Sequence, residues 1–145
     1  MDTGSVAREV KLTLPGSIRS KKNSKRLVQV GGKRAPKRWV ILPSKTYQQW
    51  EKQARWAARA QYKLPPMEHD VHVEIHVFYK GPMPDLSGCL ESCGDCLEGI
   101  VWLNDKQIKS WDGSRLCHDI RNPRTEVIVR RFGEPEKEIH QARLF

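Results

Sequence analysis

The stretch 71–79 constrains the fold more than any other part of the chain, because apolar residues occupy every second position in it. Alternation with a period of two predicts a strand that buries one face and leaves the other half-exposed. A sheet is therefore part of the fold. The alternating positions are Val71, Val73, Ile75, Val77 and Tyr79.

Two segments with helical periodicity flank this strand in the sequence. Residues 45–61 repeat apolar side chains at helical spacing after Ser44, which is a good N-cap. A second helix is predicted to begin at Asp85 and to run to about Leu97, with Gly99 just beyond its end as a C-terminal cap. The apolar positions of the first helix are Tyr47, Trp50, Ala54, Ala57 and Ala58.

Other short apolar runs predict further strands, and the order of all elements indicates the fold class. Strand, hairpin, helix, strand, helix and strands predict one small mixed α/β (α+β) domain with about six strands and two main helices. A chain of 145 residues is long enough for one such domain. We expect this domain at 8–132, a disordered N-terminus at 1–7 and a polar tail at 133–145. The further strands are expected at 8–14, 27–30, 39–42, 106–111 and 125–132, with a basic loop at 31–38 inside the hairpin.

Positive charge is concentrated in the first quarter of the chain. Residues 1–38 contain eleven Lys and Arg against two acids, whereas residues 39–145 contain fifteen of each sign. A basic block of this kind attracts polyanions by counterion release, so nucleic acid is the predicted partner. An anionic membrane surface is the weaker alternative, because no amphipathic helix accompanies the charge. The residues expected to contact DNA are Arg19, Lys21, Lys22, Asn23, Lys25, Arg26, Lys33, Arg34, Lys37 and Arg38.

The sequence carries no membrane or export signal. No apolar run approaches the length of a membrane span, and the first five residues lack the charged and apolar regions of a signal peptide. We therefore expect a soluble cytoplasmic protein with no membrane partner, and we expect its four cysteines to be reduced.

Three of the cysteines, Cys89, Cys93 and Cys96, have the spacing of the iron–sulfur sites in radical-SAM enzymes. Such enzymes need a much larger barrel domain than this chain can supply. On a helix the same positions form one stripe with neighbouring leucines, which favours burial in the core. A zinc site that recruits Cys117 and His118 is the remaining alternative.

The polar face of the 71–79 strand carries His72, Glu74 and His76. These side chains are able to bind a metal ion, but such a face is more often solvated or part of a subunit contact. Aromatic residues pose a similar choice between stacking on DNA bases and packing in the core. Core packing is favoured for Trp39, Tyr47 and Trp111.

Carboxylates occur at the entrance of the second predicted helix and again in the turn after it. Asp85 opens the helix, and Asp105 lies several residues beyond its end. If the chain folds back after Gly99, the two acids converge, as Mg²⁺-assisted phosphodiester hydrolysis requires. The alternative roles are helix capping for Asp85 and turn formation for Asp105.

The segment 84–108 contains these acids within a longer ordered pattern. Its residues Asp85, Asp95, Leu97, Trp102, Asp105, Gln107 and Ile108 match a motif that runs Pro-Asp-Leu-Asp-Asn-x-x-x-Lys, Asp-x-Leu and Trp-x-Asp-Asp-x-Gln-Ile/Val. That motif is the one of RusA-like Holliday-junction resolvases, which the chain resembles over roughly 10–130. Leu-Pro-Gly at 14–16, Ser-Lys-Lys-Asn at 20–23 and Ser-Lys-Thr-Tyr at 44–47 are similar to the same family.

The resemblance implies a homodimer that binds four-way DNA junctions and makes paired nicks with Mg²⁺ or Mn²⁺ and no small-molecule cofactor. In the family the acids of the motif bind metal and its lysine aids catalysis. Carried over to this chain, Asp85, Asp105 and Glu91 are the expected metal ligands. Asp95 is expected to support catalysis beside them.

Four positions depart from the family's motif. Its second acid is Ser87 here, its asparagine is Gly88, its lysine is Glu91, and the first acid of its downstream pair is Asn104. Glu91 shares one helix face with Ser87 and Asp95, so it either replaces a lost ligand or is an exposed helix residue. It cannot stabilise anionic charge as a lysine does. We therefore predict a resolvase-like endonuclease, with a catalytically impaired junction-binding protein as the alternative and a zinc- or cluster-binding protein as a third hypothesis.

Overall fold

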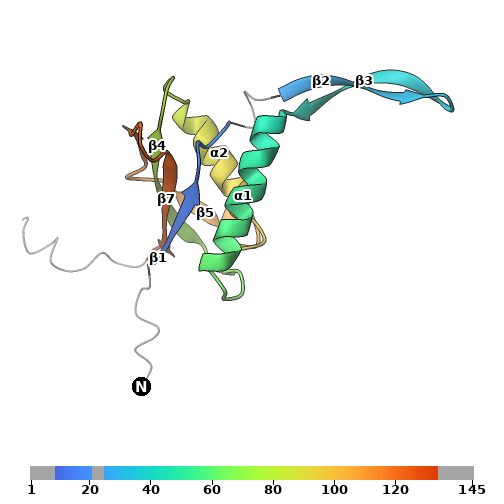
Figure 1. The fold of residues 1–145 in the computed structure, drawn as a ribbon. Helices are drawn as coiled ribbons and strands as arrows, with labels where there is room; N and C mark the ends of the chain where they lie inside the picture. Colours follow the sequence, from blue (N-terminus) through green and yellow to red (C-terminus); the bar gives the residue numbers. More distant parts are fainter. Residues whose placement is uncertain (1–8, 21–24, 134–145) are drawn as a thin grey trace, which may run out of the picture.

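The computed structural model describes residues 9–20 and 25–133, and within them it contains seven strands and two α-helices (Figure 1). The predicted mixed α+β fold is confirmed. In chain order the elements are β1 (Val10–Pro15), β2 (Lys25–Gly32), β3 (Ala35–Pro43), α1 (Lys45–Gln61), β4 (Val71–Tyr79), α2 (Leu86–Leu97), the 3-10 helix η2 (Asp105–Gln107), β5 (Ile108–Ser110), β6 (Arg115–His118) and β7 (Arg124–Arg131).

Strand β4 is the centre of a five-stranded mixed sheet with the order β1-β7-β4-β5, in which β6 also pairs with β4. The β4–β7 pair is antiparallel, whereas β5 and β6 pair in parallel with successive parts of β4. Between those two parts, the backbone N–H of Ile75 donates to Ser114 Oγ at 3.0 Å. Parallel strands need a crossover connection, so α2 and η2 must pass over the sheet on the way from β4 to β5.

Both helices lie on the same side of the sheet (Figure 1). The alternating positions of β4 pack under them, as the sequence predicts, and β1 and β7 contribute their own alternate positions. None of the helices in the described residues is long and apolar enough to cross a membrane. Fully buried strand residues are Leu14, Val71, Val73, Ile75, Val77, Val127 and Val129, and the helices add Tyr47, Trp50, Ala54, Ala58 and Leu97.

The cysteines of α2 lie in this core. Cys89, Cys93 and Cys96 are completely buried, which confirms the predicted apolar stripe. Burial raises the pKa of Cys89 to about 11 and that of Cys96 to about 12, and it raises the pKa of Cys93 well above its usual value. Since metals bind the thiolate, these thiols are poor ligands. Among the described residues, no group of three or more His, Cys, Asp or Glu is placed to hold a metal ion, which also removes support from a zinc site at Cys117 and His118.

Strands β2 and β3 form a separate antiparallel hairpin that projects away from the body of the molecule (Figure 1). It continues almost directly into α1, so it is attached at the N-terminal end of that helix. The prediction that Trp39 packs in the core is wrong, because the hairpin extends beyond the sheet and helices that form the core. Tyr47 is buried as predicted, and Trp111 packs partly buried against the core.

Several boundaries differ from the sequence predictions. The basic loop expected at 31–38 is wrong, because both strands continue through it and leave a two-residue turn at Lys33 and Arg34. The strand expected at 106–111 is shorter, because its first residues belong to η2. Strand β6 was not predicted, since its four residues show no clear alternation. The expectations for 1–7 and 134–145 lie outside the described residues.

Candidate active site

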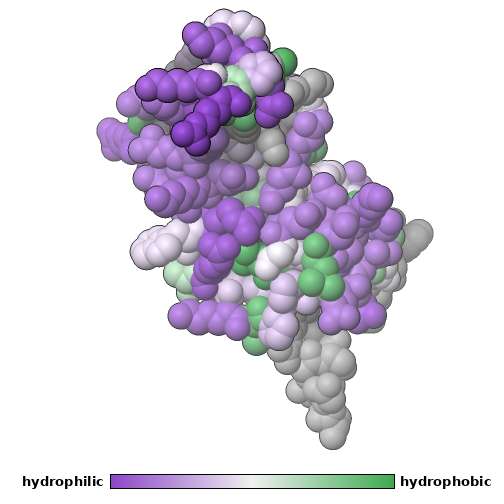
Figure 2. All heavy atoms as spheres, turned by 90° about the vertical axis from the view of Figure 1, so that its right-hand side faces the viewer, coloured by the Kyte–Doolittle hydropathy of each residue, from purple (hydrophilic) through white to green (hydrophobic). Residues whose placement is uncertain are grey.

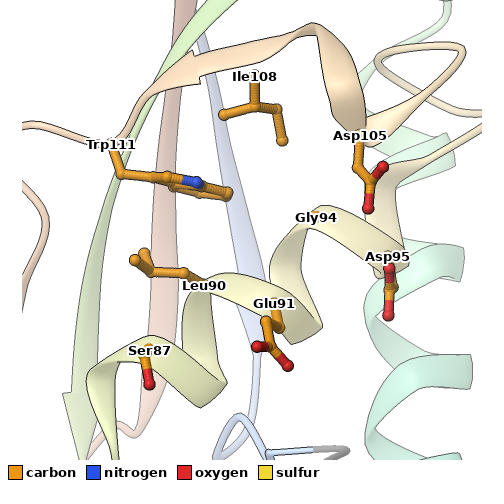
Figure 3. A pocket seen from close by; sticks show the side chains of 8 residues that line it. All are labelled: Ser87, Leu90, Glu91, Gly94, Asp95, Asp105, Ile108 and Trp111. Atoms are coloured by element: carbon orange, nitrogen blue, oxygen red, sulfur yellow. The ribbon is translucent and has the colours of Figure 1, made fainter.

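A pocket of about 500 Å³ lies between α2 and the segment that leads from η2 through β5 to Trp111 (Figure 3). It exists because the crossover brings α2 back over the sheet edge where β5 begins. Its lining combines acids with an apolar wall. The lining residues are Ser87, Leu90, Glu91, Gly94, Asp95, Asp105, Ile108 and Trp111.

One side of the pocket is a single face of α2. Ser87, Glu91 and Asp95 recur at every fourth position, so they lie above one another on that face, as the sequence predicts. The opposite face of the helix carries the buried cysteines, which fix the rotation of the helix about its axis. In Figure 3 Asp95 lies toward the end of α2 nearest Asp105, and Glu91 projects from the preceding turn.

The other side of the pocket carries Asp105, and its neighbours rather than its own carboxylate form the turn. Asn104 is the N-cap of η2, with its Oδ1 accepting the Lys106 N–H at 2.8 Å. Gln107 completes a capping box, because its Oε1 accepts the Asn104 N–H at 2.8 Å. The predicted turn chemistry is therefore performed by Asn104 and Gln107. The carboxylate of Asp105 remains exposed and points toward α2 (Figure 3).

Gln107 also anchors this turn to the rest of the domain. Its Nε2 donates to the carbonyl oxygens of Met67 and His69, both at 2.8 Å, while its Oε1 also accepts the Leu103 N–H at 3.0 Å. The sequence pattern included Gln107 but assigned it no role. The signal that could have revealed one is its place three residues after Asn104, which is the spacing of a capping box.

Two further contacts tie the turn to α2. The buried Trp102 donates its indole N–H to the Gly94 carbonyl at 3.1 Å, and the Asp105 N–H donates to Glu98 Oε1 at 3.0 Å. Gly94 lies close to the turn, since a Cβ built on it would be in ordinary contact with Asp105 Cβ at 3.7 Å. Asp105 is thus held beside the α2 acids by residues on both sides of the pocket.

Asp85 is placed differently from the other acids. It is the N-cap of α2, where its Oδ2 accepts the Gly88 N–H at 3.3 Å and the Ser87 hydroxyl at 3.0 Å. Helix capping, the alternative role for this residue, is therefore present in the structure. Ser87 both lines the pocket and bonds Asp85, so it is the link between them.

The start of the basic block is anchored on α2. The Ser92 hydroxyl donates to the Arg19 carbonyl at 2.6 Å, and Ser20 lies directly against Gly88. Lys21, Lys22 and Asn23 lie outside the described residues, as does the side chain of Lys25. The remaining predicted DNA contacts, which are Arg26, Lys33, Arg34, Lys37 and Arg38, are on the hairpin.

The polar face of β4 does not contribute to this pocket. His76 Nε2 and Glu74 Oε2 share a hydrogen bond of 2.6 Å. His72 is buried, and its pKa is lowered mainly by that burial and further by the nearby Arg130. The described residues offer no metal-binding group on this face.

Comparison with protein families identifies the chain. The model of the family described as Endodeoxyribonuclease RusA matches residues 15–130 of the 145. The chain belongs to the RusA family. No curated protein matches the chain at a significant level. RusA proteins are endodeoxyribonucleases that resolve Holliday junctions, act on branched DNA and generally depend on divalent metal ions.

The RusA match runs from the last residue of β1 to Arg130 in β7 and includes both sides of the pocket. The donor atoms of the pocket are carboxylate and hydroxyl oxygens without sulfur or imidazole nitrogen. Oxygen donors suit Mg²⁺ and Mn²⁺ rather than zinc. Mg²⁺ commonly uses one or two protein carboxylates together with substrate phosphates and water. This donor set is chemically compatible with such an ion, although residues 9–20 and 25–133 contain no group of three or more His, Cys, Asp or Glu placed to hold one.

Proposed function

We propose that this protein is a Mg²⁺- or Mn²⁺-dependent endonuclease that resolves Holliday junctions or related branched DNA, with the pocket beside α2 as its active site. The observation that carries this proposal is the position of Asp105. Its carboxylate is released from turn formation by Asn104 and Gln107 and faces the acidic side of α2. Because Asn104 and Gln107 make the capping bonds, the Asp105 carboxylate is available to bind a metal ion across the pocket from Glu91 and Asp95.

Within this proposal, Asp105, Glu91 and Asp85 hold the metal and Asp95 supports the site. A bound ion would polarise the phosphodiester and stabilise charge on the attacking and leaving oxygens. Asp105 and Glu91 line the pocket directly. Asp85 acts from the mouth of the helix, where its second oxygen is not used in the two capping bonds. The Ser87 hydroxyl orients that carboxylate.

The basic residues seat the DNA. The Arg19 carbonyl accepts the Ser92 hydroxyl of α2, so the exposed Arg19 side chain would hold a DNA phosphate beside this helix. The hairpin supplies further cations at a distance from the pocket. We include a homodimer in the proposal because two symmetrical nicks need two active sites, which two copies of the chain supply.

A second candidate function is junction binding without cutting. Measured against the family motif, Ser87, Glu91 and Asn104 replace two acids and a lysine. Asn104 Oδ1 makes the N-cap bond of η2, which supports a structural role at that position. Among the residues that the structure describes, no Lys or Arg lines the pocket to stabilise anionic charge. These features are the basis of the second candidate. The absence of metal-dependent cutting would decide in its favour.

The test is incubation of purified protein with a labelled synthetic four-way junction in Mg²⁺, Mn²⁺ or EDTA. Asp105→Asn is the active-site variant, and Asp70→Asn, an exposed acid before β4, is the matched control. Paired nicks that need metal, persist in Asp70→Asn and vanish in Asp105→Asn are the expected result. Binding without any cutting would establish the second candidate, and a failure to bind junctions would overturn both.

A further inference from the structure

The projecting hairpin exposes large apolar side chains on one of its faces. Leu27 is paired with Ile41 and Gln29 with Trp39, so these four residues share that face. Leu27, Trp39 and Ile41 are 63%, 62% and 67% exposed. We call Leu27, Trp39 and Ile41 the Trp39 face.

Nothing in the described part of the chain covers the Trp39 face. The hairpin makes its main contacts between its own two strands and extends away from the helices (Figure 1). From the side toward which it projects, the molecular surface is mostly hydrophilic with a few separate hydrophobic areas (Figure 2). An isolated two-stranded ribbon is marginally stable in water. A ribbon with an exposed aromatic and aliphatic face therefore indicates an interaction surface.

The charge of the hairpin indicates what kind of partner it binds. The segment 25–43 contains six cationic residues and no acid. Two such hairpins packed against each other would bring twelve positive charges together without compensation, so a second copy is a poor occupant. A polyanion neutralises these charges and releases counterions. The cationic residues are Lys25, Arg26, Lys33, Arg34, Lys37 and Arg38.

The Trp39 face indicates which part of the DNA the hairpin contacts besides the phosphates. Phosphates neutralise the cations, but they offer nothing to Trp39, Leu27 or Ile41. Those side chains match the flat faces of bases, which are hidden by stacking within a continuous duplex and exposed where the stack is interrupted. Trp39 is the residue best suited to stack on such a base, and a two-stranded ribbon is narrow enough to enter a DNA groove.

We propose that the hairpin recognises the branch point of the DNA, with the Trp39 face packed on bases exposed there and the cations of the hairpin on the flanking phosphates. This inference rests on the proposed function, because it takes branched DNA as the substrate. It adds the element that distinguishes a branch from a linear duplex. Phosphate contacts alone do not make that distinction.

The test compares Trp39→Ala with Trp56→Ala, which removes a still more exposed tryptophan (75% against 62%) from α1. Affinities are measured in EDTA for a four-way junction and for a linear duplex of the same arm sequence. Loss of one stacking contact is expected to weaken junction binding by roughly 5- to 150-fold. Duplex binding should be nearly unchanged in both variants, and Trp39→Phe should restore most of the junction affinity.

A second readout follows the bases directly. A junction with 2-aminopurine at the branch should change fluorescence when the wild-type protein binds, and this change should be lost in Trp39→Ala but retained in Trp56→Ala. Equal losses on junction and duplex, or no loss on either, would overturn the inference. So would conversion of a dimer to a monomer by Trp39→Ala in sedimentation, since the face would then be covered by a second copy.

The two proposals fail in distinguishable ways. If the wild-type protein cuts junctions while Trp39→Ala binds and cuts them normally, the branch-recognition role is wrong and the proposed function stands. If the wild-type protein binds a junction no better than a duplex and does not cut it, the proposed function is wrong, and the inference that depends on it is wrong as well.

Discussion

The hairpin 25–43 and the pocket beside α2 are built in opposite ways. The hairpin is a two-stranded ribbon with positive charge and exposed apolar side chains, and it projects away from the core. The pocket carries negative charge on a helix whose opposite face is completely buried and on a turn held by a capping box. Metal chemistry needs atoms held to small tolerances, which packed elements provide. Binding a long polyanion needs reach and charge, which a projecting ribbon provides.

This contrast teaches that DNA binding and DNA cutting depend on different residues of the chain. A change in the pocket should lower the cutting rate and leave the DNA affinity intact. A change in the hairpin should lower the DNA affinity and leave the cutting rate of fully bound junction intact. Each of the following substitutions tests that separation.

The largest effect is expected from Asp105→Asn. The amide has the shape of the carboxylate but not its charge, so the cutting rate should fall on the order of a thousandfold. Single-turnover cleavage of a labelled junction in Mg²⁺ measures this, and gel-shift affinity in EDTA should change by no more than about twofold. A parallel loss of affinity would break the separation, because it would place Asp105 in the DNA-binding surface.

The next effect is expected from removing the charge at the hairpin turn. In the double variant Lys33→Ala/Arg34→Ala, the slope of log affinity against log salt should become shallower by about 1.8, if each side chain contacts one phosphate. The matched control is Arg115→Ala/Arg121→Ala, two exposed arginines at and after β6. The cutting rate of fully bound junction should not change. An equal change of slope in the control would show that the protein binds DNA without using the hairpin in particular.

A smaller effect is expected from Gln107→Ala. Four hydrogen bonds of this side chain hold the turn that carries Asp105, and their loss should lower the free energy of unfolding by about 1–3 kcal/mol. As a positioning residue, Gln107 should affect the cutting rate of bound junction and not its affinity. Gln107→Glu keeps the acceptor for the Leu103 and Asn104 N–H groups but turns a carboxylate oxygen toward the Met67 and His69 carbonyl oxygens, so it should lose at least as much stability as Gln107→Ala. Urea unfolding and single-turnover cleavage check the two effects, and an unchanged cutting rate in Gln107→Ala would show that the turn does not need this anchor.

Several elements that these substitutions probe could be predicted from the sequence. The helix at 45–61, the strand at 71–79 and the cysteine stripe follow from periodicity, because each element buries one face in a single core. The alternation of β4 is clear in the sequence, and four of its five alternating apolar residues, Val71, Val73, Ile75 and Val77, are completely buried.

The sequence predicts that Asp85 and Asp105 converge if the chain folds back after Gly99. The chain does fold back, but the pocket is lined by Asp105 together with Glu91 and Asp95, and Asp85 is not among its lining residues.

Other features were beyond the reach of local pattern. Trp39 was assigned to the core because large aromatic residues are usually buried, and no local signal shows that a hairpin leaves the body of the molecule. Strand β6 is formed by pairing with the far end of β4 rather than by its own alternation. The division of work between Asn104, which caps the turn, and Asp105, which faces the pocket, depends on contacts to Met67 and His69 that lie about forty residues away in the sequence.

The smallest effect is expected from Gly94→Ala, which separates stability from function inside the pocket itself. Alanine is favoured over glycine in a helix interior by about 1 kcal/mol, and the added Cβ would lie at ordinary contact distance, 3.7 Å, from both Asp105 Cβ and Ile108 Cδ1. The variant should therefore unfold at higher urea concentration, while its narrower pocket cuts junctions a fewfold more slowly and binds them normally.

Gly88→Ala is the matched control on the same helix. Its Cβ would lie 2.8 Å from Ser20 Cβ and closer still to the Ser20 hydroxyl, so the segment before the hairpin must move. This variant should gain no stability, and its DNA affinity should fall because the anchor of the basic block on α2 is disturbed. If Gly94→Ala weakened DNA binding as much as Gly88→Ala, the pocket and the basic segment would form one functional surface on α2. Cutting and binding would then not depend on separate residues of this helix.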